Sequence, residues 1–387
     1  MTQSIPPADR QAPHAEELHA AELAFLAAWD DGPRPPGWRL TPRAVVTFVA
    51  GSGGDTLKLP GRAETGEGVP RALRITEKFV GDRALVERCV VTLAGERGLL
   101  LVGDPGTAKS MLSELLAAAI SGTSALTVQG TAGTTEEQLR YGWNYALLLA
   151  RGPTAEALVP SPVLTAMRKG AIARVEEVTR CLPEVQDALV SILSDRRLAV
   201  PELTDGGGAE PARKGFNVIA TANLRDRGVS EMSAALKRRF NFETVPAIGE
   251  STRETALVKE KARAALALQG EPLRVDDAVL EALVTAFRDL REGRTAEGWA
   301  VERPASVMST AEAVAVASAL GLQSAYFASE RDVASLLPGY LLGVVLKDDP
   351  KDRGRLLAYW DGAVKRRAEG GSRLWRRLLE LRAVLEG

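Results

Sequence analysis

The sequence contains few residues that bind metals or carry redox chemistry. Its 387 residues include two cysteines and two histidines. Cys89 and Cys181 lie inside apolar patterns, while His14 and His19 both lie near the start. These positions do not have the ligand spacing of a zinc site, so we do not expect one. We expect both cysteines to be buried free thiols in a reducing compartment, which favours a cytoplasmic protein.

The sequence also lacks long apolar runs and an excess of charge. No apolar run approaches the ~18 residues that cross a bilayer, and the first residues do not join a basic segment to an apolar core. We therefore expect neither a membrane span nor a secretion signal. Lys and Arg number 49 against 50 Asp and Glu, a balance that argues against a nucleic-acid or membrane-surface protein. The length predicts roughly two to three domains of ~150 residues each.

One stretch joins an apolar run to a glycine-rich turn. Leu99 to Val102 contains no polar residue, which is typical of a strand buried on both faces of a parallel sheet. The turn leads into Lys109-Ser110 and then a helical pattern. This layout predicts a phosphate-binding P-loop. The residues expected to bind phosphate are Gly103, Asp104, Pro105, Gly106, Thr107, Ala108, Lys109 and Ser110.

Each residue type in this loop has a chemical purpose. Gly103 and Gly106 allow the backbone to wrap closely around phosphate oxygens, and the following helix N-terminus adds partial positive charge. Lys109 supplies a full positive charge, and Ser110 supplies a hydroxyl for Mg²⁺. The pattern G-x-x-x-x-G-K-[ST] has glycine where this chain has Ala108. The alternative interpretation of the stretch alone is an ordinary strand-turn-helix corner with a surface lysine.

Two acidic residues follow a second apolar segment, Ala171–Val175, which Arg174 interrupts. Glu176 and Glu177 lie at its carboxyl end, where open α/β sheets bind ligands. A P-loop ATPase needs one carboxylate in the Mg²⁺ shell and another that orients water. Glu176 is one methylene longer than the usual Asp, so it would contact the metal through water or sit back from it. The alternative is a solvated helix start.

Two further polar features follow apolar segments. We expect residues 197–202 and 216–220 to pair as a hairpin with a long loop. The second arm leads to Asn223, whose amide either hydrogen-bonds a water or phosphate or serves as a turn residue. The segment Leu236–Phe240 is basic. Its Arg239 either reaches the phosphates of another subunit or belongs to a solvated patch.

The remaining sequence suggests three regions. Residues 1–70 are expected to form an extension, with a disordered start, a helix over 15–29, a strand or buried helix at 44–50 and a linker to Pro70. Residues 71–248 are expected to form an α/β nucleotide-binding domain, and residues 249–387 an all-helical domain. Helices are expected at 83–93, from Pro183, and at 253–268, 275–291, 309–322, 330–345 and 354 to near the end.

The order of these motifs resembles that of the AAA+ ATPases, and within them the MoxR-like branch. That branch reads Pro-Gly-x-Ala-Lys-Ser/Thr in its P-loop, as Pro105 to Ser110 do here. The segment before the Glu pair and the hairpin before Asn223 resemble the two insertions of the clade that contains MoxR proteins. The similarity covers about residues 75–345. It implies an α/β fold: an AAA+ P-loop NTPase core, with a parallel sheet between helices, and a C-terminal all-helical lid domain. Stretches at 129–137, 141–145, 174–177 and 223–228 resemble a bacterial MoxR-type subgroup.

The resemblance also implies roles for individual residues. Lys109 binds phosphate, Ser110 and Glu176 associate with Mg²⁺, and Glu177 is the catalytic glutamate. Asn223 matches the position called sensor 1.

Two arginines complete this comparison. Arg239 matches the arginine finger that reaches the ATP of a neighbouring subunit. Sensor 2 has no clear match, and Arg303 is the nearest arginine.

The implied activity is ATP hydrolysis in a homo-oligomeric ring, expected to be a hexamer. By this resemblance, the ring would remodel, assemble or activate a protein client, such as one with a von Willebrand factor A domain. One alternative is a nucleotide-gated scaffold with little turnover. A nucleic-acid-stimulated motor is the other, which the near-neutral charge disfavours and only Arg213-Lys214 supports. No membrane partner is expected.

Overall fold

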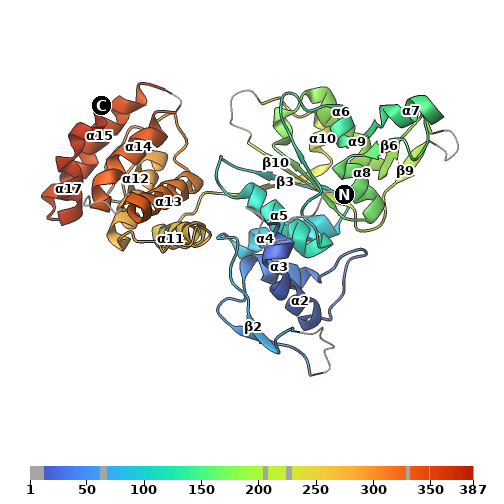
Figure 1. Ribbon diagram of the computed structural model, residues 1–387, viewed down its shortest axis with the longest axis horizontal. Coiled ribbons are helices and arrows are strands. Elements are labelled where there is room, and N and C mark those ends of the chain that lie inside the picture. The colour runs from blue at the N-terminus through green and yellow to red at the C-terminus, as the bar shows by residue number, and fades with distance from the viewer. Residues whose placement is uncertain are drawn as a thin grey trace. The chain divides into compact units, whose positions relative to one another are not determined.

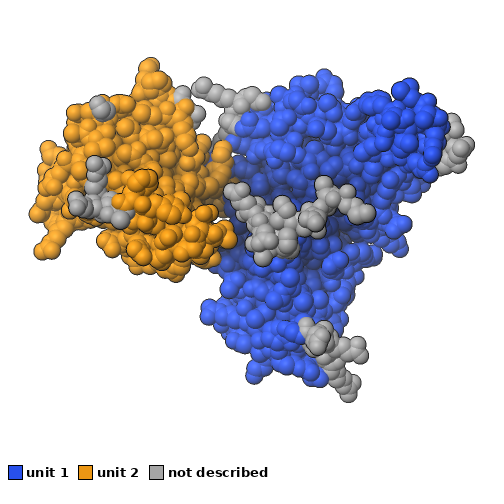
Figure 2. Space-filling view, viewed as in Figure 1, with its two compact units in different colours: residues 1–104, 108–245 blue, residues 105–107, 246–387 orange. Residues whose placement is uncertain are grey.

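The computed structural model describes residues 13–61, 68–203, 208–223, 229–327, 332–347 and 349–386. Its contacts divide the chain into two compact units, which Figure 2 shows in different colours. Unit 1 comprises residues 1–104 and 108–245, and unit 2 comprises residues 105–107 and 246–387. The expected disorder at the start falls mostly on residues outside the described ones. No described helix is both long and apolar enough to cross a membrane.

Unit 1 is built on a five-stranded parallel sheet in the order β11-β3-β10-β7-β4. Its strands are β3 (Gly98–Val102), β4 (Thr127–Gln129), β7 (Ile172–Glu176), β10 (Asn217–Ala222) and β11 (Phe240–Thr244). All residues of β3, β7 and β10 are buried. Leu99 and Leu101 join one hydrophobic cluster, while Leu100 and Val102 join another. This confirms the predicted sheet buried on both faces.

Helices cover both faces of this sheet. Helices α4 and α5 contact β3 and β10 on one side (Figure 1). Met167 of α8 and Leu189 of α9 pack in the cluster on the other side, with Leu100. Asp82 caps α4 by accepting from the Ala84 amide. The helices of this core are α4 (Arg83–Ala94), α5 (Lys109–Ser121), α6 (Glu136–Leu139), α8 (Pro162–Lys169), η2 (Val178–Arg180), α9 (Pro183–Asp195) and α10 (Ala234–Lys237).

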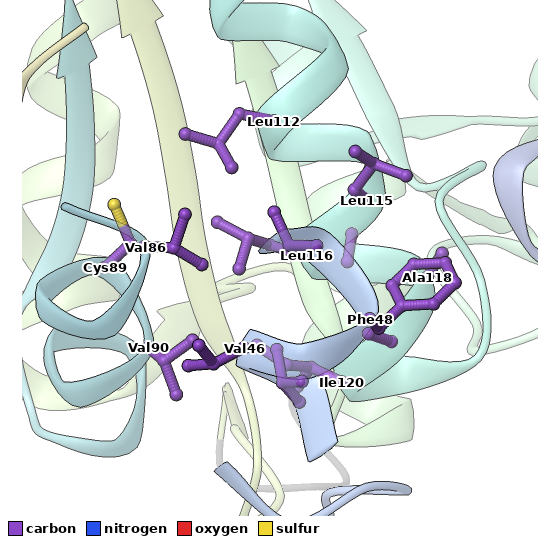
Figure 3. Close-up of a cluster of buried hydrophobic side chains, with 14 of the residues drawn as sticks. Val46, Phe48, Val86, Cys89, Val90, Leu112, Leu115, Leu116, Ala118 and Ile120 are labelled. Carbon is purple, nitrogen blue, oxygen red and sulfur yellow. The ribbon is translucent and has the colours of Figure 1, made fainter. Parts of the chain in front are cut away.

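The N-terminal extension is part of the unit 1 core. Figure 3 shows side chains of α3, α4 and α5 gathered in one buried cluster, among them Val46, Val86 and Leu116. The segment 44–50, left open between strand and helix, is helical, with Thr41 as its N-cap. The single helix expected over 15–29 is wrong in one respect, because it breaks at His19. The elements are α1 (Ala15–Leu18), α2 (Ala20–Trp29), α3 (Pro42–Ala50), β1 (Thr56–Lys58) and β2 (Ala72–Arg74).

Two small hairpins lie outside the central sheet. Strand β5 (Tyr141–Trp143) pairs with β6 (Leu158–Pro160), and α7 (Tyr145–Arg151) connects them. The expected hairpin between 197–202 and 216–220 is wrong. Strand β8 (Arg197–Ala199) pairs instead with β9 (Ala209–Pro211), while the apolar residues after Phe216 form central strand β10. Strand β10 is buried throughout, and its backbone hydrogen-bonds to a neighbouring strand on each side, β3 and β7. A two-stranded hairpin would leave the backbone groups on one side of this buried strand unpaired.

The regular secondary structure of unit 2 is all helical among its described residues, apart from one isolated bridge between Arg294 and Ala300. Fully buried Glu254 accepts hydrogen bonds from Arg288, Arg291 and Thr310, which ties three helices together. The expected helices are present, but the last two are divided into shorter segments. They are α11 (Ser251–Ala267), α12 (Asp277–Glu292), α13 (Thr310–Phe327), η4 (Val333–Leu336), α14 (Leu337–Val345), α15 (Asp352–Tyr359), η5 (Trp360–Val364), α16 (Lys365–Glu369), α17 (Arg373–Glu380) and η6 (Arg382–Leu385).

The two cysteines are free and buried, as expected. Burial raises the pKa of the Cys89 thiol to about 12, and nearby Glu243 adds to the effect. Because the thiolate is the reactive form, Cys89 is a packing residue in this fold.

Candidate functional site

The loop between β3 and α5 has the backbone of a close-fitting turn. Gly103 and Gly106 have φ values of 158° and 75°. Ala108 is left-handed at φ 66°, a conformation that costs a residue with a Cβ about 1–2 kcal/mol, and it stands at the N-cap of α5. Its methyl packs against the hydrophobic cluster of unit 1. The methyl group that distinguishes Ala108 from the glycine of the usual pattern is therefore accommodated by apolar packing.

Lys109 begins α5 and turns back toward the preceding loop. Its Nζ donates to the carbonyl oxygens of Gly103 and Asp104, each at 2.9 Å. The side chain is 5% exposed. Burial lowers the pKa of Lys109, and the negative charges of Glu177, Asp104 and Glu176 oppose that shift. A buried ammonium held by weak neutral acceptors is suited to an incoming anion.

Glu176 ends β7 and is 4% exposed. Its Oε2 accepts from the hydroxyls of Ser110 at 2.7 Å and Thr221 at 2.8 Å. The other oxygen, Oε1, accepts from Ser113 Oγ at 2.5 Å and Arg174 Nη2 at 2.8 Å. Four donors therefore surround a carboxylate that the sheet removes from water. The carboxylate lies against α5 and the neighbouring strand β10.

Arg174 is the counter-ion that makes this burial possible. It lies two residues before Glu176, so the two side chains point to the same face of β7. It is 8% exposed. Besides Glu176, the guanidinium donates to Ser113 Oγ at 3.0 Å and to the carbonyls of Ser110 and Ser124, each at 3.1 Å. The residue that seemed to interrupt an apolar strand is thus an internal partner of the acidic site.

Glu177 has a different environment from its neighbour. Its backbone is left-handed at φ 54° and ψ 47°, a sparsely populated conformation that is concentrated at functional sites. Its amide donates to Thr221 Oγ1 at 2.9 Å. Its Oε2 is buried without a hydrogen-bond partner among the described residues, although Arg180 Nε lies 3.7 Å away. This oxygen is able to accept a hydrogen bond from a water or ligand.

Gly130 follows β4 and lies against the backbone of the Glu pair. A Cβ at this position would lie 2.4 Å from the carbonyl oxygen of Glu177 and 2.8 Å from that of Glu176. The Gly130 amide donates to the Glu176 carbonyl at 2.7 Å. Any side chain here would displace the turn that orients Glu177.

Asn223 and Arg239 lie at opposite ends of the parallel strands, Asn223 at the carboxyl ends and Arg239 at the amino ends. Asn223 directly follows β10, whose Ala222 pairs with Val102, so it lies at the same carboxyl edge as Gly103. It is 4% exposed. The carbonyl of Arg239 instead accepts from the amide of Gly98, at the amino end of β3. Strands rise about 3.3 Å per residue, so Gly98 and Val102 lie about 13 Å apart.

The side chain of Arg239 is half-buried, and its Nε donates to Ser194 Oγ at 2.6 Å. Arg303, in unit 2, donates to the carbonyl of Glu292 and lies over Gly293, where it caps the end of α12. The structure therefore brings Lys109, Ser110, Glu176, Glu177 and Asn223 to one edge of the sheet. The residues 224–228 that follow Asn223 lie outside the described residues.

The oxygen donors at this edge fit a magnesium ion. Ser110 Oγ and Glu176 Oε2 are hard ligands 2.7 Å apart. Among the described residues no group of three or more His, Cys, Asp or Glu side chains could hold a metal. Mg²⁺ typically uses one or two protein oxygens together with phosphates and waters, so this small donor set suits a nucleotide-bound ion.

Sequence reasoning missed four residues of this site: Ser113, Arg174, Thr221 and Gly130. The spacing offered a signal for two of them. Ser113 follows Ser110 by three residues and so shares its helix face. Arg174 precedes Glu176 by two residues and so shares its strand face. Thr221 and Gly130 act across strands, and their roles follow only from the strand order.

Arg174→Met is expected to destabilise unit 1 by about 3–5 kcal/mol, because it leaves Glu176 as a buried charge without its counter-ion. The measurement is urea denaturation of the whole chain. Arg151→Met is the matched control, because Arg151 and Glu156 form an ion pair in unit 1 whose two side chains are both exposed. An exposed pair contributes about 0–1 kcal/mol. Equal losses in the two variants would show that Glu176 does not depend on Arg174.

Comparison with known proteins agrees with this architecture. Residues 98–240 match the AAA domain of the dynein-related subfamily, and residues 252–386 match the YehL-like AAA+ ATPase C-terminal domain. The chain is 48% identical over 357 residues to the uncharacterized protein YehL of Escherichia coli (strain K12), covering 92% of each chain. It is 30% identical to the uncharacterized protein SH1500 of Staphylococcus haemolyticus (strain JCSC1435), covering 54% of this chain and 74% of that protein.

Among solved structures, NtrX from Brucella abortus in complex with ATP is a distant likeness. Its TM-score is 0.45 at 17% identity, and the match covers 79% of this chain and 69% of that chain. The two family matches and the near full-length similarity to YehL are the informative findings. The chain therefore belongs to the MoxR-like AAA+ ATPases, and within them to the YehL-like family.

Proposed function

We propose that this chain binds ATP with Mg²⁺ at the carboxyl edge of its parallel sheet and hydrolyses it. The observation that carries the proposal is the convergence of Lys109, Ser110, Glu176 and Glu177 at that edge. Lys109 would exchange its two carbonyl acceptors for phosphate oxygens, which attract an ammonium more strongly. Mg²⁺, bound by Ser110 with Glu176 behind it as the acceptor of the Ser110 hydroxyl, would neutralise charge on the phosphates.

Glu177 is the proposed residue that orients the attacking water. Its Oε2 is buried and without a hydrogen-bond partner among the described residues, so it is able to accept from water at the edge where the phosphates would lie. Glu176 is unsuited to that task, because four donors already occupy its oxygens. Asn223, at the end of the adjacent strand, is a second proposed contact for the water or the γ-phosphate.

Arg239 is proposed to act on the nucleotide of a neighbouring copy. It lies at the amino edge of the sheet, with its carbonyl on Gly98, whereas the P-loop of the same copy lies at the carboxyl edge. It is therefore poorly placed for the phosphates of its own copy. Completing each site from a neighbour requires an oligomer, which we propose to be a hexameric ring in the cytoplasm.

The ring is further proposed to remodel, assemble or activate a protein partner, such as a von Willebrand factor A domain protein. Unit 2 would convert the nucleotide state into motion. The near-neutral net charge of −1 supports a protein client over a nucleic acid. Residues 1–70, 71–248 and 249–387 are proposed as the extension, the nucleotide-binding domain and the lid. The division by contacts lies between Val245 and Pro246.

Glu177→Gln is expected to lower steady-state phosphate release by about 10²-fold or more while ATP still binds, because the amide no longer accepts a proton from water. Phosphate release and nucleotide affinity are both measured. Glu184→Gln, an exposed carboxylate in the first turn of α9, is the control and should retain wild-type activity. A wild-type chain that binds ATP without releasing phosphate would support the scaffold alternative instead.

Arg239→Ala is expected to lower turnover by about 10³-fold or more, as for other arginine fingers. Mixing Arg239→Ala chains with Lys109→Ala chains should restore part of the activity, since some interfaces then combine an intact P-loop with an intact arginine. Arg238→Ala, a change at an exposed neighbouring arginine, should leave turnover near wild type. Mixtures that stay inactive, while each variant still assembles, would contradict a role across the interface.

The remodelling proposal predicts that Glu177→Gln chains with ATP retain a specific protein from a cell extract. The same chains carrying Lys109→Ala as well should lose it, because they no longer bind ATP. Pull-down followed by mass spectrometry makes the comparison. If both chains retain the same proteins, the association does not depend on ATP and the remodelling proposal loses its support.

A further inference from the structure

The N-terminal extension is hydrogen-bonded to the turn that joins α5 to β4. The carboxylate of Glu16, in α1, accepts from the Ser124 amide at 3.0 Å and from its hydroxyl at 2.7 Å. In return, Glu114 of α5 accepts from the Ala15 amide at 3.0 Å. Arg39 lies against the same turn. Its side chain covers Gly122, where a Cβ would lie 2.3 Å from its Nε.

The same turn reaches the nucleotide site from behind. The carbonyl of Ser124 accepts from Arg174 Nη1 at 3.1 Å. Arg174 Nη2 donates to Glu176 Oε1 at 2.8 Å, and Glu176 Oε2 accepts from Ser110 at 2.7 Å. An unbroken chain of hydrogen bonds therefore runs from Glu16 to the P-loop serine. It passes through Ser124, which donates to Glu16 and accepts from Arg174.

The links in this chain are stiff. Ser124 is 1% exposed, so its groups have no easy replacement in water. Burial would raise the pKa of Glu16, but the hydrogen bonds from the Ser124 backbone and side chain outweigh it, and the pKa lies below its usual value. Glu16 is thus ionised at neutral pH, which strengthens its bonds to Ser124. The guanidinium of Arg174 is a rigid planar fork, so moving one acceptor reorients all of its donors.

We propose that helix α1 is a positioning element of the nucleotide site: Glu16 holds Ser124, Ser124 holds Arg174, and Arg174 sets the place of Glu176. The proposal rests on the proposed magnesium-dependent binding of ATP at Ser110 and Glu176.

Packing alone does not account for α1. Only Ala15 of its four residues is buried, whereas α3 contributes six buried residues to unit 1. The specific contacts of α1 are polar and converge on α5 and the turn after it. Stability alone would not require α1 to bind the residue whose carbonyl accepts from Arg174.

The test measures magnesium dependence rather than turnover. A fluorescent ATP analogue is titrated onto the full-length chain in EDTA and at increasing Mg²⁺, for the wild type and Glu16→Ala. Residues behind a metal ligand typically tune metal affinity by 10–100-fold, and Glu16 lies two contacts beyond Arg174, so we expect half-saturating Mg²⁺ to rise roughly 3- to 10-fold. Affinity in EDTA should be unchanged, because Lys109 and the loop backbone are untouched.

Glu17→Ala is the matched control on the same helix, since the Glu17 carboxylate accepts from the His14 amide at the helix's own cap. It should leave the magnesium titration at the wild-type value. In an Arg174→Lys background, Glu16→Ala should add little, because the path is already weakened. Glu16→Gln, which keeps one acceptor oxygen, should give an intermediate shift and serves if Glu16→Ala does not fold.

Three results would overturn the proposal. The first is that Glu16→Ala has the same half-saturating Mg²⁺ concentration as the wild type. The second is that Glu17→Ala raises this concentration as much as Glu16→Ala does. In the third, the effects of Glu16→Ala and Arg174→Lys on half-saturating Mg²⁺ are independent. In each of these cases the wild type still binds nucleotide with Mg²⁺, so the proposed function stands. A wild type without magnesium-dependent binding overturns both.

Discussion

The structure of unit 1 depends on one carboxylate, Glu176, that is buried at the end of a central strand of the sheet. Removing a carboxylate from water costs several kcal/mol even after the protein relaxes. The fold compensates by bringing donors from three elements to its two oxygens: Ser110 and Ser113 from α5, Thr221 from β10 and Arg174 from β7 itself. Each donor is useful only at one register of helix and strands. The charge therefore links the stability of the fold to the geometry of the candidate site.

This link explains why the site contains strained backbone. Ala108 and Glu177 are both left-handed without being glycine, and each such residue is unfavourable unless its surroundings impose it. The core holds Ala108 through its methyl, and Thr221 holds the amide of Glu177 while its hydroxyl also binds Glu176. Gly130 leaves the space that the Glu177 carbonyl needs. The two carboxylates therefore differ in their hydrogen bonding. Both oxygens of Glu176 accept hydrogen bonds, whereas Glu177 keeps a buried oxygen available to a water or ligand.

Local patterns were sufficient for part of this description. The P-loop, the Glu pair and Asn223 were predicted because each is a short motif at the end of an apolar strand, and parallel strands bring such ends to one edge. Strand pairing was predicted less well. Residues 209–211 carry no strand pattern, so β8 was paired with the apolar residues that belong to β10. Thr221 and Gly130 escaped notice for the same reason, since their partners are known only once β10, β7 and β4 are placed side by side.

The glutamate at position 176 is best understood together with the arginine at 174. An aspartate would end about 1.5 Å earlier, by one carbon–carbon bond, and would reach the hydroxyl of Ser110 less easily while also meeting Ser113 and Arg174. The longer side chain spans both groups, with one oxygen on the counter-ion and the other on the P-loop serine. Arg174 in turn is too long and too polar for a buried strand unless several acceptors receive it, and the Ser110 and Ser124 carbonyls do so. Each residue is the charged partner that allows the other to be buried in β7. A change at either position alone therefore leaves the other as a buried charge without its partner.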